Sequence, residues 1–313
     1  MFDRLVVTGA NGFLANELFK ELGAHGFDHH ILAVTRNCNL NLEKYGIKDY
    51  SLAPTTSIAS GTESLKKDDL ILNCAFPRNA DPYKLAPGLE YIDTVFQRAS
   101  WANVRGLINI SSQSVYDPLR AHPANEDSPL VLESPYAVAK FHTEVILEKN
   151  CRHIPHTNIR LASLIGPQLS SRVLNKFIAS ALAGKTIAIA ESGKLFGYLD
   201  VRDAALALAV LIESEPHNWA NVYNIGPDES YSLTSLAERI AKIIPGVSTR
   251  ITVSKDEQQV SSAIDSDKFR TQFDWSPSFN IEDSIQSIIE YELNAKGADH
   301  SERGAFLYRA REY

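Results

Sequence analysis

The amino-acid sequence predicts an α/β protein built on a doubly wound parallel sheet. Two observations lead to this fold class. An apolar strand at residues 5–8 runs through a glycine-containing turn into a helix-like segment that ends near Gly23 and Gly26. Apolar strand-like segments then alternate with helix-like segments, and this alternation implies right-handed crossovers between parallel strands. In such sheets, ligands bind beyond the carboxyl ends of the strands.

Composition places the chain among ordinary globular proteins. Its 313 residues are 44% hydrophobic and 22% charged, which suits one large or two small domains. A formal charge of −7 gives no electrostatic reason to expect nucleic acid or a membrane as partner. The three cysteines are too few for a disulfide framework, and no apolar run is long enough to span a bilayer. We therefore expect a cytoplasmic protein.

The first turn has the spacing Gly9-x-x-Gly12-x-x-Ala15. Glycines between a buried strand and a helix let backbone N–H groups approach a pyrophosphate, where the helix dipole favours negative charge. The alternative is a turn that needs glycine for its conformation only. We expect a dinucleotide to contact the turn and the first helical residues: Gly9, Asn11, Gly12, Phe13 and Leu14.

The second strand, predicted at residues 31–34, is followed by Thr35 and Arg36. An acidic residue at this place usually accepts hydrogen bonds from the ribose 2′-OH, whereas an arginine can pair with a 2′-phosphate. Arg36 therefore favours NADP over NAD. The alternative is that Arg36 is an exposed loop residue with no role in binding.

Further elements are predicted from buried apolar runs and from a helical pattern: strands near residues 47–52, 69–75 and 106–110, and a helix over residues 87–102. Ala75 ends one of these strands and is expected to contact the cofactor, with Phe76, Pro77 and Arg78 lying over it. Ser112 follows the last strand and is expected at the ligand-binding edge of the sheet.

Ser134 and Pro135 are suited to begin a helix, on which Tyr136 and Lys140 stand four residues apart. A nearby ammonium favours the phenolate form of a tyrosine, which makes Tyr136 a candidate general acid/base. The hydroxyl of Ser112 could donate a hydrogen bond to the reacting oxygen. Such a tyrosine–lysine pair is by itself most often a surface pair, but with the glycine turn and Ser112 it predicts a catalytic trio.

Together these segments resemble the extended short-chain dehydrogenase/reductase family, in its NAD-dependent epimerase/dehydratase branch. The resemblance covers nearly the whole chain and also includes residues 158–161, 165–167, 176–178 and 222–226. It implies a Rossmann domain that binds NAD(P) (residues 1–165 and 196–226) and a smaller C-terminal substrate domain (residues 166–195 and 227–313). It also implies that Tyr136 exchanges a proton with the sugar, that Lys140 holds the nicotinamide ribose, and that the chain forms a homodimer.

Departures from the family pattern narrow this prediction. Family dehydratases carry Asp-Glu where this chain has Gln113-Ser114, which argues against a 4,6-dehydratase. Phe196 stands where many nucleotide-sugar enzymes have an arginine for the pyrophosphate, and Ser163 stands where they have an asparagine. Arg172 or Arg270 could supply the missing cation; the alternative is that each is a surface charge.

Three hypotheses follow. The first is an NADP-dependent oxidoreductase that reduces a keto group of a sugar, which we expect to be nucleotide-linked, and in which Tyr136 protonates the oxygen. The second is a nucleotide-sugar 4-epimerase that uses the same trio and retains NAD. The third is a non-catalytic NAD(P) sensor, which predicts a degraded trio, whereas Ser112, Tyr136 and Lys140 are all present. The histidines show no metal-ligand spacing, so we expect no metal.

Overall fold

The computed structural model describes residues 2–77, 81–191, 193–253 and 260–295. Seven parallel strands form one sheet in the order β11-β6-β5-β4-β1-β2-β3, which confirms the predicted doubly wound α/β fold. The order in which successive strands are added to the sheet reverses between β1 and β4, and such sheets bind ligands at this point. The strand bounds are β1 Arg4–Thr8, β2 His30–Thr35, β3 Tyr50–Pro54, β4 Asp69–Asn73, β5 Gly106–Ser112, β6 His156–Leu161 and β11 Val222–Ile225.

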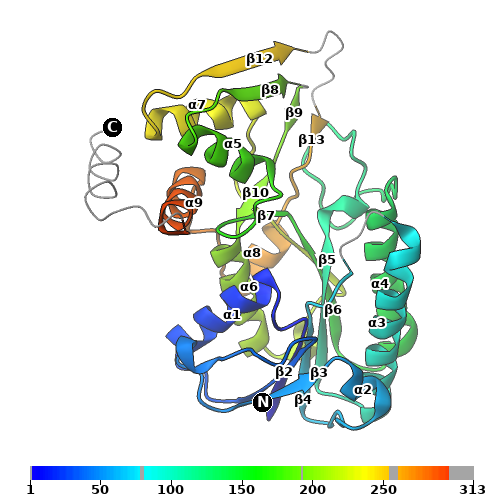
Figure 1. Cartoon of the computed structure of the whole chain (residues 1–313). Coiled ribbons are helices and arrows are strands. Elements are labelled where there is room, and N and C mark those ends of the chain that lie inside the picture. The colour runs from blue at the N-terminus through cyan, green and yellow to red at the C-terminus, as the bar shows by residue number, and fades with distance from the viewer. Residues whose placement is uncertain (1, 78–80, 192, 254–259, 296–313) are drawn as a thin grey trace.

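Helices cover both faces of this sheet (Figure 1). On one face α1 (Phe13–Ala24) packs against α6 (Val201–Glu213), and on the other α3 (Pro82–Ala102) packs against α4 (Pro135–Cys151). The short α2 (Thr56–Ser60) lies beside α3. The central strands are consequently buried on both sides, as their continuous apolar sequences predict.

A row of polar side chains crosses the buried sheet. Thr8 Oγ1 donates to Asn73 Oδ1 (2.6 Å), and Asn73 Nδ2 donates to Asn109 Oδ1 (2.9 Å). Asn109 Nδ2 donates in turn to Asn158 Oδ1 (2.8 Å) and to Thr143 Oγ1 of α4 (3.1 Å). The strand residues of this row are register partners on β1, β4, β5 and β6, so their hydrogen bonds support the register of the four strands.

A second hydrophobic cluster lies above the sheet in Figure 1. It joins three helices and one strand of a two-stranded sheet: α5 (Val173–Leu182), α7 (Leu233–Ile243), α9 (Ile281–Ala295) and β8 (Ile187–Glu191), which pairs with β12 (Thr249–Val253). The remaining short elements are η1 Glu43–Tyr45, η2 Gln113–Val115, β7 Ser163–Ile165, β9 Lys194–Leu195, β10 Tyr198–Asp200, η3 Pro216–Asn218, β13 Val260–Ser261 and α8 Asp267–Phe273.

The predicted domain boundaries remain a prediction, and one segment packs differently from them. Ile264, Phe269 and Trp275 fall within the range predicted for the substrate domain. They nevertheless belong to the hydrophobic cluster that contains α1, α6 and the central strands. α8 packs on β11. Residues 296–313 of that predicted domain lie outside the described residues, as does Arg78.

Two predicted elements differ from the structure. The helix predicted at residues 87–102 begins at Pro82, because Asp81 Oδ1 accepts a hydrogen bond from Tyr83 N (3.0 Å) and caps it; Pro87 lies inside this helix. The strand predicted near residues 47–52 runs from Tyr50 to Pro54, because Ile47 is buried as a loop residue. No helix in the described ranges combines the length and apolar character needed to cross a membrane.

Candidate active site

A cleft of about 790 Å³ opens at the carboxyl edge of the sheet, beside the point where strand order reverses. It is lined by the turn after β1, the ends of β2 and β4, and α3. Five residues predicted to bind the cofactor line it: Gly9, Asn11, Gly12, Arg36 and Ala75. Leu14 is instead buried in the core, and Phe13 faces the β7–α5 connection, where a methyl group at Gly166 would lie 3.1 Å from its Cζ.

The first turn passes very close to the end of β4. Gly9 has φ +68°, and a Cβ atom there would lie 2.7 Å from the backbone nitrogen of Ala75. Only glycine fits both the conformation and the space. Gly12 caps α1 without a side-chain hydrogen bond. The N–H groups of the first helical turn therefore have no side-chain acceptor, and they suit a phosphate group.

One wall of the cleft comes from the first half of α3, which the sequence prediction missed. Lys84, Pro87, Gly88 and Tyr91 line the cleft at helical spacing. The Tyr91 hydroxyl is buried without a hydrogen-bond partner, and burial raises its pKa to about 12, so it remains a proton donor. The signal that could have found this wall is the Asp81-Pro82 pair, a typical helix start.

The charge of this cleft is positive. Among the described residues, its lining includes the exposed Arg36 and Lys84 but no carboxylate. The orphan hydroxyl of Tyr91 and the uncapped N-terminus of α1 offer donors, and Gly9 leaves room for a ligand to approach the backbone. This set of groups fits an anionic dinucleotide.

Tyr136 and Lys140 lie on α4, which begins where Ser134 Oγ accepts a hydrogen bond from Ala137 N (3.1 Å). Lys140 is buried, and its Nζ donates to the carbonyl oxygen of Ile110 (2.8 Å) on β5. Tyr136 is half-buried. Because Ile110 lies two residues before Ser112 on the same strand, this bond holds Lys140 beside the strand end that carries Ser112.

Ser112 lies at the end of β5 and is buried. Its Oγ donates to Ser114 Oγ (3.0 Å) and accepts from Ser114 N (3.2 Å), so it caps η2, against which α4 packs. The structure therefore brings the segments of the predicted trio together at one edge of the sheet. The catalytic roles of the three residues remain predictions.

Phe76 connects the trio to the cleft. It lines the cleft, its ring centroid lies 3.9 Å from Lys140 Nζ, and it meets the Tyr136 ring edge-on at 5.4 Å. Cys74, two residues before Phe76, also lines the cleft. Burial raises the pKa of its thiol to about 12, although the charge of Lys140 opposes this shift.

A buried ion pair lies beneath the trio. One turn after Lys140, Glu144 accepts from Arg160 Nη2 (2.8 Å) and Nε (3.1 Å) and from Ser111 Oγ (2.5 Å). Arg160 Nη1 donates to the Tyr116 hydroxyl (2.9 Å). Burial opposes the charge of Arg160, but the bonds to Glu144 outweigh it and raise the arginine's pKa. Because each charge is paired, the pair links α4, β5 and β6 without leaving a buried charge uncompensated.

The departures from the family pattern also have structural partners. Gln113 Nε2 donates to Ser163 Oγ (3.4 Å), so two of the departing residues contact each other, and Gln113 Oε1 accepts from Arg120 Nη2 (2.8 Å). Phe196 stacks parallel to Tyr198 at 5.7 Å.

The two arginines considered as replacement cations differ in their surroundings. Arg270 is paired with Asp228 and also donates to the carbonyl oxygen of Gly226 (3.3 Å), so its guanidinium is already engaged. Arg172 lies at the start of α5, where its charge acts on the hydroxyl of Tyr198.

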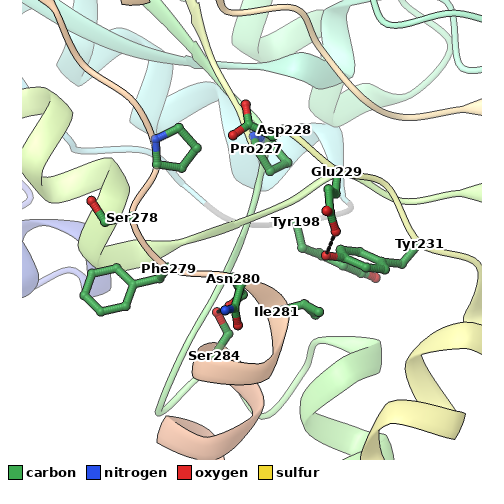
Figure 2. A pocket seen from close by; sticks show the side chains of 11 residues that line it. Tyr198, Pro227, Asp228, Glu229, Tyr231, Ser278, Phe279, Asn280, Ile281 and Ser284 are labelled. Atoms are coloured by element: carbon green, nitrogen blue, oxygen red, sulfur yellow. Dashed lines mark hydrogen bonds between the residues drawn. The ribbon is translucent and has the colours of Figure 1, made fainter.

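A smaller cavity of about 170 Å³ lies where β10, the segment before α7 and the start of α9 meet (Figure 2). In Figure 2 the Tyr231 hydroxyl donates to Glu229, and Ser284 lies at the opposite side of the cavity. None of the predicted catalytic or cofactor residues lines this cavity. Within the described ranges, no three His, Cys, Asp or Glu side chains are placed to hold a metal ion.

Comparison with known proteins gives a family match and proteins of similar sequence. The model of the family described as "NAD dependent epimerase/dehydratase family" matches residues 5–226. The chain is 25% identical over 324 residues to a UDP-glucose 4-epimerase of Mycolicibacterium smegmatis (93% of this chain, 99% of that protein). It is 24% identical over 220 residues to the low-salt glycan biosynthesis protein Agl12 of Haloferax volcanii (68% and 70%).

Solved structures share the fold. The UDP-glucuronic acid 4-epimerase of Bacillus cereus, solved in complex with UDP-glucuronic acid and NAD, superimposes with a TM-score of 0.78 at 18% identity. The match covers 93% of this chain and 99% of that one. At this identity the likeness supports the fold alone.

Proposed function

This chain belongs to the NAD dependent epimerase/dehydratase family, and from that premise we propose that it is a nucleotide-sugar 4-epimerase that retains its dinucleotide. One observation carries the proposal: Phe76 lines the dinucleotide cleft and contacts both Tyr136 and Lys140. The tyrosine–lysine pair therefore stands at the end of the cleft, where a sugar carbon could meet the cofactor. The epimerase hypothesis is placed before the reductase hypothesis because a protein similar over nearly the whole chain is a UDP-glucose 4-epimerase.

The residues that would hold the dinucleotide are Gly9, Gly12 and Asn11 at the phosphates, Arg36 at the adenosine ribose, and Lys140 at the nicotinamide ribose. When bound, the dinucleotide supplies a hydride acceptor and then a hydride donor to the opposite face of the same carbon. Tyr136 takes the proton of the sugar hydroxyl as its carbon is oxidised and returns it on reduction. Ser112 donates a hydrogen bond to that oxygen as its charge changes.

The positions of Lys140 and Gln113 support this chemistry. The buried ammonium of Lys140 is fixed on the Ile110 carbonyl and lies one helical turn from Tyr136. Gln113 is a neutral amide held by Arg120 and Ser163, so it supplies no acid for the elimination of water. This favours epimerisation over dehydration.

The test begins with denaturing the purified protein and identifying any nucleotide released. We expect retained NAD, and interconversion of UDP-glucose and UDP-galactose, or of another pair of C4 epimers, without net change in NADH absorbance. If the protein contains no nucleotide and needs added NADPH in stoichiometric amounts, the epimerase proposal is wrong.

One observation favours a second candidate, an NADPH-dependent reductase of a keto-sugar. Arg36 and Lys84 line the cleft, and no carboxylate stands among its lining residues in the described ranges, which suits the 2′-phosphate of NADP. Arg36→Glu is then expected to weaken NADPH binding by about tenfold or more, since hydrogen bonds to charged groups contribute about 1.5–3 kcal/mol. Titration of protein fluorescence with NADPH and NADH measures this, with Lys20→Glu on the outer face of α1 as the control. Equal affinity of the unsubstituted protein for both nucleotides would remove the candidate.

A further inference from the structure

Phe76 has a position that neither the family match nor the predicted trio explains. It follows β4 directly, is half-buried, and packs against the hydrophobic cluster beneath α3 and α4. Its ring also lines the dinucleotide cleft. One side chain thus touches the core, the cleft and the predicted catalytic pair.

The contact with Lys140 is specific in geometry. The ammonium nitrogen lies 3.9 Å from the centre of the Phe76 ring, which is the arrangement of a cation–π interaction. The same nitrogen donates to the Ile110 carbonyl, and its charge acts on the neutral thiol of Cys74. The ring therefore covers part of a buried ammonium that water would otherwise reach from the cleft.

The same ring also contacts Tyr136. The two rings are nearly perpendicular (83°) with their centres 5.4 Å apart, a favourable edge-to-face arrangement. Tyr136 lies in the first turn of α4, and its side chain is only half-buried. An aromatic neighbour on a different element restricts where its phenol can point.

We propose that Phe76 is a positioning residue for the Tyr136–Lys140 pair: its ring shields the ammonium from water and orients the phenol before substrate binds. The proposal rests on the proposed function only in taking Tyr136 and Lys140 as the catalytic pair. Its action is indirect, through these two side chains.

The first test needs no substrate. Lys140 is labelled by reductive methylation of the cofactor-free protein, and the extent at each lysine is measured by peptide mass spectrometry. Phe76→Ala opens Lys140 to the reagent from the cleft and is expected to speed its methylation about tenfold, whereas Phe76→Tyr, which keeps the ring, leaves the rate unchanged. Lys20, whose side chain is 51% exposed, is the internal control in every variant.

Phe76→Leu keeps most of the apolar volume without a ring face, and it serves if the alanine variant does not fold. With dinucleotide and a sugar nucleotide, it is expected to lower kcat about tenfold while KM stays nearly constant. Phe76→Tyr should restore the rate. This split separates a positioning role from a general loss of structure, which melting curves monitor independently.

Two results would overturn the proposal. One is an unchanged methylation rate of Lys140 in both Phe76→Ala and Phe76→Leu. The other is tighter dinucleotide binding by Phe76→Ala with undiminished turnover, which would make the ring an obstacle in the cleft. If the unsubstituted protein converts no sugar nucleotide, the proposed function is wrong. The methylation rates of Lys140 still test whether Phe76 shields this side chain.

Discussion

At the scale of single residues, the proposed chemistry depends on the Tyr136 hydroxyl. Tyr136→Phe removes the proton donor but keeps the ring that meets Phe76. We expect turnover to fall by at least about 100-fold, the range of general acid–base contributions, with dinucleotide affinity unchanged. Turnover assays and a nucleotide titration on the same preparation measure both quantities. Unchanged cellular function with intact nucleotide binding would instead support the sensor hypothesis.

Asp203 gives a second prediction at this scale, one of pH dependence. Its side chain is fully buried at the start of α6 and accepts from Ser278 N (2.7 Å) and Phe279 N (3.1 Å), next to the small cavity of Figure 2. Burial raises the pKa of this carboxyl to about 6, an effect that the two backbone hydrogen bonds only partly oppose. The folded protein therefore holds this proton to a higher pH than the unfolded chain does.

The sign of the effect follows from that difference. The contribution of Asp203 to the free energy of unfolding is fully present below about pH 4 and is lost as the pH rises towards 6, by on the order of 2–3 kcal/mol. Asp203→Asn cannot titrate and should lack this loss. Urea unfolding of both proteins between pH 4 and pH 7 measures it, because all other groups contribute equally. Parallel stability profiles of the two proteins would contradict the prediction.

At the scale of elements, the row of asparagines ties the strands together. Asn109→Leu would leave the Asn73 amide, the Asn158 carbonyl and the Thr143 hydroxyl without their present partner. Each orphaned buried polar group costs about 1–3 kcal/mol, so we expect the free energy of unfolding to fall by about 3 kcal/mol or more.

The control for this variant is Asn221→Leu. Asn221 is exposed, and its described contact with the row is made by its backbone carbonyl, which the substitution keeps. The free energy of unfolding of this variant should therefore change by less than about 0.5 kcal/mol. Chemical denaturation of both variants gives the comparison. Equal stability of Asn109→Leu and the unsubstituted protein would show that the row contributes no net stability.

At the scale of the whole molecule, the homodimer remains a prediction. The outward face of α4 carries Val138 and Val145, two turns apart, with exposed fractions of 50% and 46%. Apolar residues repeated on one exposed helix face suit a two-fold interface. We expect a dimer by light scattering, and a monomer when both valines are replaced by glutamate. A monomeric unsubstituted protein at micromolar concentration would contradict the prediction.

The sequence by itself determined the features that depend on neighbours along the chain. The strand–turn–helix start, the cap at Ser134 and the four-residue spacing of Tyr136 and Lys140 follow from local backbone rules, and they were sufficient for the fold class and the family. The cap at Asp81 was equally local, but the helical pattern beginning at Pro87 concealed it.

Only the tertiary structure decided which distant residues meet. Three contacts join residues that are 36 to 64 positions apart in the sequence: Phe76 with Lys140, Gln113 with Ser163, and Asn109 with its neighbours Asn73 and Asn158. Strand order and helix packing create these contacts, and no spacing in the sequence records them. The cleft is for the same reason a property of the folded chain: its described lining residues come from five separate segments, which become neighbours only when the sheet forms.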